Sequence, residues 1–169
     1  MLRPCRQPRT GPDRTEAYRR GALETPVFAW VVAMIESTPA VQPVRPDRDV
    51  PTRQGLPYFV GISGQTVGAR GLSMHLVVIP PGARAEPHAH RGHETGIYVL
   101  EGRVETRWGA NLEHSVVSAA GEFLFIPPGV PHEAINLSAT EPARAVVARN
   151  DPAEQDKVVP YVAAAPSPA

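Results

Sequence analysis

The sequence predicts an all-β fold, either a sandwich or a barrel, and two observations support this prediction. From about residue 55, short apolar runs recur at intervals of about 8–12 residues, and no segment keeps a helical period. The chain of 169 residues also contains 20 prolines and 14 glycines, which suits short strands separated by frequent turns. The predicted strands are Tyr58–Ile62, Leu72–Ile79, Ile97–Leu100, Val104–Trp108, Ser115–Ala119, Glu122–Ile126, His132–Asn136 and Ala143–Ala148.

Local patterns refine several of these elements. In the run Leu72–Ile79 alternate residues make one face uniformly apolar, and Met74 on that face is expected in the core. Residues 109–111 (Gly-Ala-Asn) predict a hairpin turn. Residues 127–129 (Pro-Pro-Gly) predict a rigid corner, because proline fixes φ and glycine accepts conformations that other residues avoid. Helix is expected only near residues 151–156, where an Asp-Pro pair supplies an N-cap and a first-turn proline.

Residues 1–53 differ in composition from the rest and are predicted to be an extension outside the barrel. The stretch 2–20 is rich in arginine and almost free of apolar residues, so it is expected to be disordered. Residues 41–52 carry three prolines and are expected to form an extended lead-in, packing across the barrel or a partner subunit. We therefore expect an extension at 1–53, a barrel at 54–150 and a C-terminal tail at 151–169.

The apolar run Val27–Ile35 has two alternative interpretations. It follows Arg19 and Arg20, an arrangement that faintly resembles a secretory or twin-arginine signal, but Glu24 and Pro26 interrupt the pattern. The simpler hypothesis is that Met34 is the true start and the preceding residues are translated upstream sequence. The run is far shorter than the roughly 20 residues that a membrane-spanning helix needs.

The bulk composition limits the partners and the compartment. The chain has 17 basic and 17 acidic side chains, so its charge gives no reason to expect nucleic acid or an anionic membrane surface as a partner. The single cysteine, Cys5, cannot form an intrachain disulfide, and a cytoplasmic location is expected. The length suits one domain with a sizeable core.

Two segments place histidines among glycines and prolines at defined spacings. The first contains Gly82, His88, His90, Glu94 and Gly102, and the second contains Gly121, Pro127, Gly129, His132 and Asn136. Together they offer three imidazoles and one carboxylate, which is a coordination shell for a divalent transition metal.

These segments resemble the two motifs of the cupin superfamily, G-x5-H-x-H-x3,4-E-x6-G and G-x5-P-x-G-x2-H-x3-N. The second is matched throughout, and the first is matched with Gly102 one position late. The resemblance covers roughly residues 55–150. It implies a small double-stranded β-helix of the jelly-roll kind that holds one metal in its mouth.

The residues themselves agree with this implied site. Alternate side chains of a strand share a face, so His88 and His90 both point inward if that segment is extended, and His132 arrives from another strand. Imidazoles with one carboxylate suit Fe, Mn, Ni, Co, Zn or Cu. With His88, His90, Glu94 and His132 as ligands, a six-coordinate ion keeps two open positions, which is the mark of a catalytic site.

The fourth ligand has alternatives. Counted back from Gly102, the acidic position of the motif falls on Thr95, and a one-residue slip turns a strand side chain to the opposite face. A β-bulge at Gly96 would bring Glu94 inward, and this is the arrangement we predict. In the alternatives His93 supplies the fourth ligand, or only the three histidines bind and Glu94 acts as an acid or base.

The expected function is that of a metal-binding cupin acting on a small organic molecule, as an oxygenase-type or isomerase- or decarboxylase-type enzyme. The alternatives are a non-catalytic barrel that binds a ligand or metal as a sensor or accessory protein, and an enzyme that uses its histidines without metal. Arg144 and Arg149 are candidates for binding a carboxylate or phosphate substrate, although surface pairing is the commoner use of such arginines. A homodimer is expected, because open sheets leave edge strands unpaired, and residues 41–54 are a candidate for crossing to the partner.

Overall fold

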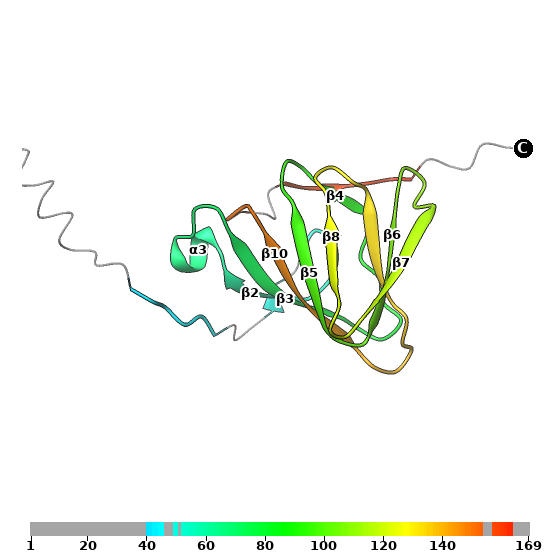
Figure 1. Cartoon of the computed structure of the whole chain (residues 1–169), viewed down its shortest axis with the longest axis horizontal. Helices are drawn as coiled ribbons and strands as arrows, with labels where there is room; N and C mark the ends of the chain where they lie inside the picture. The colour runs from blue at the N-terminus through cyan, green and yellow to red at the C-terminus, as the bar shows by residue number, and fades with distance from the viewer. Residues whose placement is uncertain (1–39, 46–48, 51, 154–156, 164–169) are drawn as a thin grey trace, which may run out of the picture. The chain divides into compact units, whose positions relative to one another are not determined.

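The structure is a computed structural model that describes residues 40–45, 49–50, 52–153 and 157–163 (Figure 1). The chain divides into two units, residues 1–41 and 42–169, and every described helix or strand lies in the second. The predictions for residues 1–39, including the disordered stretch and the apolar run before Met34, lie outside the described residues. The elements are β1 (Asp49–Val50), β2 (Tyr58–Ile62), α3 (Gly64–Val67), β3 (Ser73–Ile79), β4 (His88–His90), β5 (Thr95–Glu101), β6 (Arg103–Trp108), β7 (His114–Ala119), β8 (Phe123–Ile126), β9 (His132–Asn136), β10 (Ala143–Arg149) and β11 (Val158–Pro160).

The strands form two antiparallel sheets, which confirms the all-β prediction and the jelly-roll barrel. One sheet has six strands in the order β1-β2-β3-β10-β5-β8, and the other has five in the order β11-β4-β9-β6-β7. Figure 1 shows β5 beside β8 and β6 beside β7, as the hydrogen-bonded order requires. The eight predicted strands all appear, with ends displaced by at most two residues.

The core lies between the two sheets, and regular alternation of buried and exposed residues is clear on β3 and β10. On β10 the buried residues are Ala143, Ala145, Val147 and Arg149, and the residues between them are partly or fully exposed. On β3 the buried residues are Ser73, His75, Val77 and Ile79. The prediction that Met74 lies in the core is therefore wrong, and its side chain is exposed. Because both faces of this strand carry apolar side chains, alternation alone did not identify the inner one.

Two short strands extend the fold beyond the predicted range 54–150. Strand β1 pairs with β2 through residues 49 and 50, before the predicted start. Strand β11 pairs with β4, residue for residue, from Val158 opposite His90 to Pro160 opposite His88. The C-terminal segment therefore covers the outer edge of the strand that carries two of the predicted ligands.

The short helix α3 lies where the sequence analysis did not expect it. Ser63 accepts a hydrogen bond from the Thr66 backbone, and the Thr66 hydroxyl accepts one from the Ser63 backbone, which is a reciprocal N-terminal cap. Gly68 ends the helix in the left-handed region. Of the helix expected near residues 151–156, residues 152 and 153 form a turn, and the last three lie outside the described residues.

A single irregularity in β5 decides which of its side chains face the interior. From Thr95 to Val99, β5 pairs with β10 without interruption, with Thr95 opposite Arg149 and Val99 opposite Ala145. The next pair is Glu101 with Arg144, so Leu100 is the extra residue of a bulge. The bulge predicted at Gly96 therefore lies at the other end of the strand.

The last residue of the second motif, Asn136, has a structural role at one end of the barrel. Its buried side-chain amide donates to the carbonyl oxygens of Ile79, Pro80 and Glu141 at 3.0, 3.1 and 2.8 Å. Its side-chain oxygen accepts from the Ser138 backbone at 2.9 Å. The Asn136 side chain thus supplies hydrogen bonds to backbone groups of two connections, the one that follows β3 and the one between β9 and β10.

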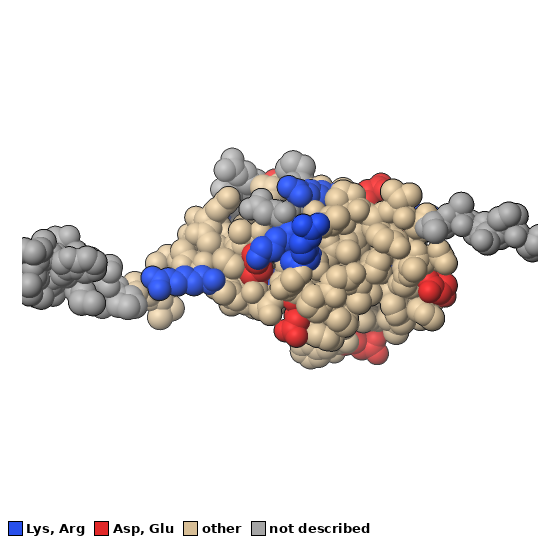
Figure 2. Space-filling model, turned by 90° about the horizontal axis from the view of Figure 1, so that it is seen from above, with Lys and Arg blue, Asp and Glu red and all other residues tan. Residues whose placement is uncertain are grey.

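The surface carries charges of both signs. On the face shown in Figure 2, basic and acidic side chains lie in small groups among uncharged residues. One surface ion pair joins Arg144 of β10 to Glu101 of β5, with 3.6 Å between Arg144 Nε and Glu101 Oε2. Among the described residues no helix is long and apolar enough to cross a membrane.

Candidate metal centre

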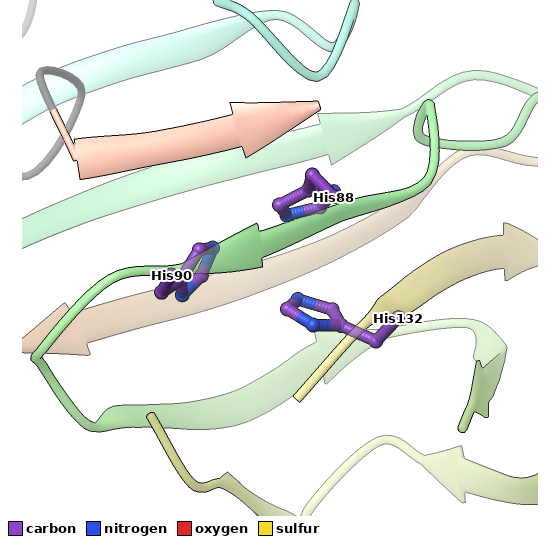
Figure 3. Close-up of side chains that lie close together, drawn as sticks. All are labelled: His88, His90 and His132. Atoms are coloured by element: carbon purple, nitrogen blue, oxygen red, sulfur yellow. The ribbon is translucent and has the colours of Figure 1, made fainter. Parts of the chain in front are cut away.

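Three of the four predicted ligands lie together on neighbouring strands. His88 and His90 project from β4 and flank Ala89, and His132 projects from β9 towards them (Figure 3). His88 and His132 are direct partners in the pairing of these strands. The ring centroids are 5.0 Å apart for His88 and His90, 4.4 Å for His88 and His132, and 4.9 Å for His90 and His132. One nitrogen from each ring lies within 4.8 Å of the others.

Hydrogen bonds to the Nδ1 atoms orient all three rings. His88 Nδ1 lies 2.7 Å from the Glu86 carbonyl oxygen, and His132 Nδ1 lies 2.8 Å from the Val130 carbonyl oxygen. A carbonyl accepts only, so these Nδ1 atoms carry the proton and their Nε2 atoms keep a lone pair. His90 Nδ1 lies 2.6 Å from the Thr95 hydroxyl. Such outer contacts are those that fix metal-binding imidazoles in proteins.

Burial keeps the imidazoles of His90 and His132 neutral. His90 is 2% exposed, and burial, followed by the positive charge of Arg149, holds its pKa far below the usual value. Burial likewise lowers the pKa of His132, against a smaller opposing effect of the Val130 carbonyl. A metal ion binds neutral imidazole. Near neutral pH these two histidines therefore have no extra proton to release when a metal binds.

The same shifts predict that the metal-free protein loses stability in mild acid. Above the ordinary histidine pKa of 6.5 the folded and unfolded states are both neutral at His90 and His132. Below it the unfolded chain binds protons that the folded chain does not. The free energy of unfolding should therefore fall by about 1.4 kcal/mol per pH unit for His90, and the lowered pKa of His132 adds a contribution of the same sign. Urea unfolding between pH 7.5 and 5.5 measures this. The exposed His114→Gln variant should keep the slope, and a flat profile would contradict the prediction.

Glu94 lies away from the three histidines, contrary to the predicted ligand set. It is exposed, its backbone N–H donates to the Asn150 side chain at 2.9 Å, and its carboxylate accepts from the same amide at 3.3 Å. Thr95 occupies the inward position instead, because the extra residue of β5 is absorbed at Leu100 and not at Gly96. The structure thus brings together His88, His90 and His132 and places Glu94 on the surface.

His93, the alternative fourth ligand, is buried beside the centre without joining it. Its ring stacks on the ring of His90 at a centroid distance of 5.0 Å and an interplanar angle of 25°. Within the part of the chain that the structure describes, the group of candidate ligand atoms contains the three histidines and neither His93 nor Glu94. His93 therefore supports the His90 ring from the side.

The three rings face a cavity between the two sheets. The empty space in and around it is about 630 Å³ when the open solvent at its mouth is counted, but only about 60 Å³ is open to the centres of water-sized molecules. Its walls are mainly apolar, and the polar side chains among its lining, besides the histidines, are Gln54, Tyr58, Thr95, Thr106, Ser118 and Arg149. A second hollow next to it is lined in part by Trp108, Phe125 and the same His132. A small organic molecule in the main cavity would therefore lie against the histidines.

These donors fit a transition metal. His90 Nε2 is buried and makes no hydrogen bond to any described residue, which is a costly state for a polar atom unless a ligand fills it. Three neutral nitrogen donors suit Fe, Mn, Co, Ni, Cu or Zn better than Mg or Ca, which prefer oxygen. Three protein ligands leave one position open on a four-coordinate ion and three on a six-coordinate ion.

No sequence pattern assigned a role to Thr95 or Gln54. Thr95 was identified only as the position on which the acidic residue of the motif would fall. Gln54 was placed just inside the barrel boundary, with no pattern to mark it as a cavity residue. Arg149 was a candidate for ligand binding, and alternation along β10 would have placed it inside, since it follows Ala143, Ala145 and Val147 at intervals of two.

Two antiparallel sheets that enclose three converging imidazoles define a β-barrel with a candidate metal centre. Residues 75–149 match the family model described as the Cupin domain. This confirms the resemblance drawn from the two motifs.

Individual proteins and solved structures are also similar to this chain. A germin-like protein, subfamily T member 3, from Arabidopsis thaliana is 33% identical over 101 residues, which are 59% of this chain and 44% of the relative. The chain spans less than half of the length of the curated germin-like proteins that it matches. Among solved structures, the polyketide cyclase RemF from Streptomyces resistomycificus is similar with a TM-score of 0.55 and 23% identity, covering 76% of this chain and 88% of that one. Oxalate decarboxylase from Bacillus subtilis, described with Mn(II) centres, is similar with a TM-score of 0.53 and 18% identity, covering 63% and 28%.

Proposed function

We propose that this cupin is a metal-dependent enzyme that acts on a small organic molecule, with one divalent transition metal held by His88, His90 and His132. The observation that carries the proposal is the direction of the three rings, whose metal-binding nitrogens converge at the wall of a buried cavity. The Mn(II) centres of the structurally similar oxalate decarboxylase make manganese one candidate for the ion. A bound ion would polarise an oxygen of the substrate, and a redox-active one would also exchange electrons with dioxygen.

The residues of the chain have separate roles in this proposal. The Glu86 and Val130 carbonyls hold two imidazoles with Nε2 towards the centre, and Thr95 holds the third. The apolar walls exclude water from the reacting atoms, which strengthens every electrostatic interaction there. An oxygenase-type reaction is the first candidate for this cavity, because its described lining offers no carboxylate as a general base and its histidines are metal ligands in this proposal.

The experiment measures the metal and the activity on the same sample. We expect elemental analysis to find about one transition-metal ion per chain, and we expect the Fe-, Mn- or Cu-loaded protein to consume oxygen with a member of a panel of small carboxylic acids and phenols. Stoichiometric metal without turnover across the panel would favour the alternative, a non-catalytic metal- or ligand-binding barrel. Turnover by the metal-free protein would contradict the proposal.

We also propose that the chain forms a homodimer. Strand β8 is an edge strand of the six-stranded sheet, and its Phe123 and Phe125 are 82% and 60% exposed. Large apolar side chains beside unpaired backbone groups favour association. Light scattering coupled to size exclusion should give twice the chain mass, and a monomer at high micromolar concentration would contradict this.

A further inference from the structure

Arg149 is buried in the same cavity as the candidate metal centre. It is 3% exposed. Besides the histidines, Arg149 is the one basic or acidic side chain among the described residues that line the cavity. It lies at the end of β10 on the inner face, directly opposite Thr95, whose hydroxyl contacts His90. Arg149 is therefore connected to His90 through Thr95, by one backbone pairing and one side-chain hydrogen bond.

The polar groups around Arg149 belong to the same part of the cavity. An Nη2 hydrogen of Arg149 is donated to the Tyr58 hydroxyl at 3.2 Å, and the guanidinium lies 5.9 Å from the centre of the Tyr58 ring. Because that hydroxyl oxygen accepts from the arginine, its own hydrogen is available to an acceptor. Tyr58 thus holds the guanidinium in place and adds a donor beside it.

Gln54 supplies a second observation that points to a ligand. It is 1% exposed and lines the cavity, and its side-chain amide makes no hydrogen bond to any described residue. A buried amide without a hydrogen-bond partner costs about 1–3 kcal/mol of folding stability. The position of this amide in a cavity wall therefore indicates a polar ligand. Its N–H₂ group is a donor that suits the oxygen of an anion.

We propose that Arg149, Tyr58 and Gln54 form a subsite that binds the carboxylate of a small monocarboxylic acid. Arg149 presents a planar fork of N–H donors that matches a carboxylate, and a divalent ion at the histidines would add positive charge to the same cavity. The remaining walls include Leu56, Val77, Ile97, Val99, Ile126 and Val147. These walls favour a small hydrocarbon group as the rest of the ligand. This inference deepens the proposed function and rests on it for the role of the metal.

The test compares carboxylates with amides of the same shape. The probes are acetate, isobutyrate and benzoate, each paired with its primary amide, and they are titrated calorimetrically into the full chain with and without Mn(II). We expect at least one carboxylate to bind ten times more tightly than its amide, with isobutyrate or benzoate ahead of acetate. No preference for any of the three carboxylates would overturn the proposal.

Two variants locate the subsite. Arg149→Gln should lower carboxylate affinity at least about tenfold, the effect of losing hydrogen bonds to a charged group, and leave amide binding unchanged. Gln54→Glu leaves Arg149 in place and adds a negative charge to the lining, so it should have the same effect. Arg144→Gln is the matched control, since Arg144 lies on the same strand but outside, against Glu101. Wild-type carboxylate affinity in either cavity variant would overturn the proposal.

Elemental analysis of the same samples separates this inference from the proposed function. A wild-type protein that binds no metal but still prefers carboxylates would contradict the metal-dependent enzyme and support the anion subsite. A protein that holds metal at the histidines but shows no carboxylate preference would support the metal centre and overturn the subsite.

Discussion

Replacing His132 with alanine should reduce bound transition metal from about one ion per chain to a small fraction, with a loss of affinity of more than roughly 100-fold. The reason is the geometry of the centre. His88 and His90 share one strand, and His132 closes the site from the neighbouring one. Without it two donors remain, and the ion has no third anchor. Elemental analysis after gel filtration, with competition against a chelator for affinity, measures the effect.

Two control variants sharpen this prediction. His75→Ala removes another buried imidazole, whose ring centroid lies 5.9 Å from that of Tyr58. Because His75 is outside the group of candidate ligands, this variant should keep the wild-type metal content. Glu94→Gln should also leave it unchanged, since the carboxylate contacts Asn150 on the surface. If Glu94→Gln released the metal as His132→Ala does, the assignment of Glu94 to the surface would be contradicted, and the original four-ligand prediction would be restored.

Replacing Asn136 with leucine should lower the free energy of unfolding by about 3 kcal/mol or more. The leucine would leave three carbonyl oxygens and one backbone N–H without the partner that Asn136 gives them. Urea unfolding of the metal-free protein measures the change. Asn111→Ala, on an exposed turn, is the matched control and should stay within about 0.5 kcal/mol of the wild type. A similarly small effect of Asn136→Leu would show that these connections do not depend on the amide.

The strand pattern predicted most of the fold. Short apolar runs between turns correctly identified eight strands, because each strand buries one face and each turn carries Gly, Pro or polar residues. Strands β4 and β11 have three residues each, too few for alternation to be visible, although β4 carries two of the candidate ligands. The assignment of Met74 to the core failed on β3, where apolar residues occupy both faces and the buried one includes Ser73 and His75.

The site could be predicted only as far as spacing determines it. His88 and His90 are two residues apart, so any extended backbone places them on one face, and the second motif supplies His132. Glu94 depended on where β5 takes up one extra residue. Gly96 was the expected position, but Leu100 is the bulged residue, and no feature of the sequence at Leu100 marks it. The choice between Glu94 and Thr95 is therefore a property of the paired sheet, not of the local sequence.

Anomalous diffraction from crystals of the Mn(II)- or Co(II)-loaded protein, at the absorption edge of that metal, tests the central claim most directly. We expect one peak at the cavity wall, about 2.1 Å from each of the three Nε2 atoms of His88, His90 and His132. Glu94 should remain on the surface beside Asn150. A peak elsewhere, or a loaded crystal with no peak among the three rings, would contradict a metal centre built by these histidines.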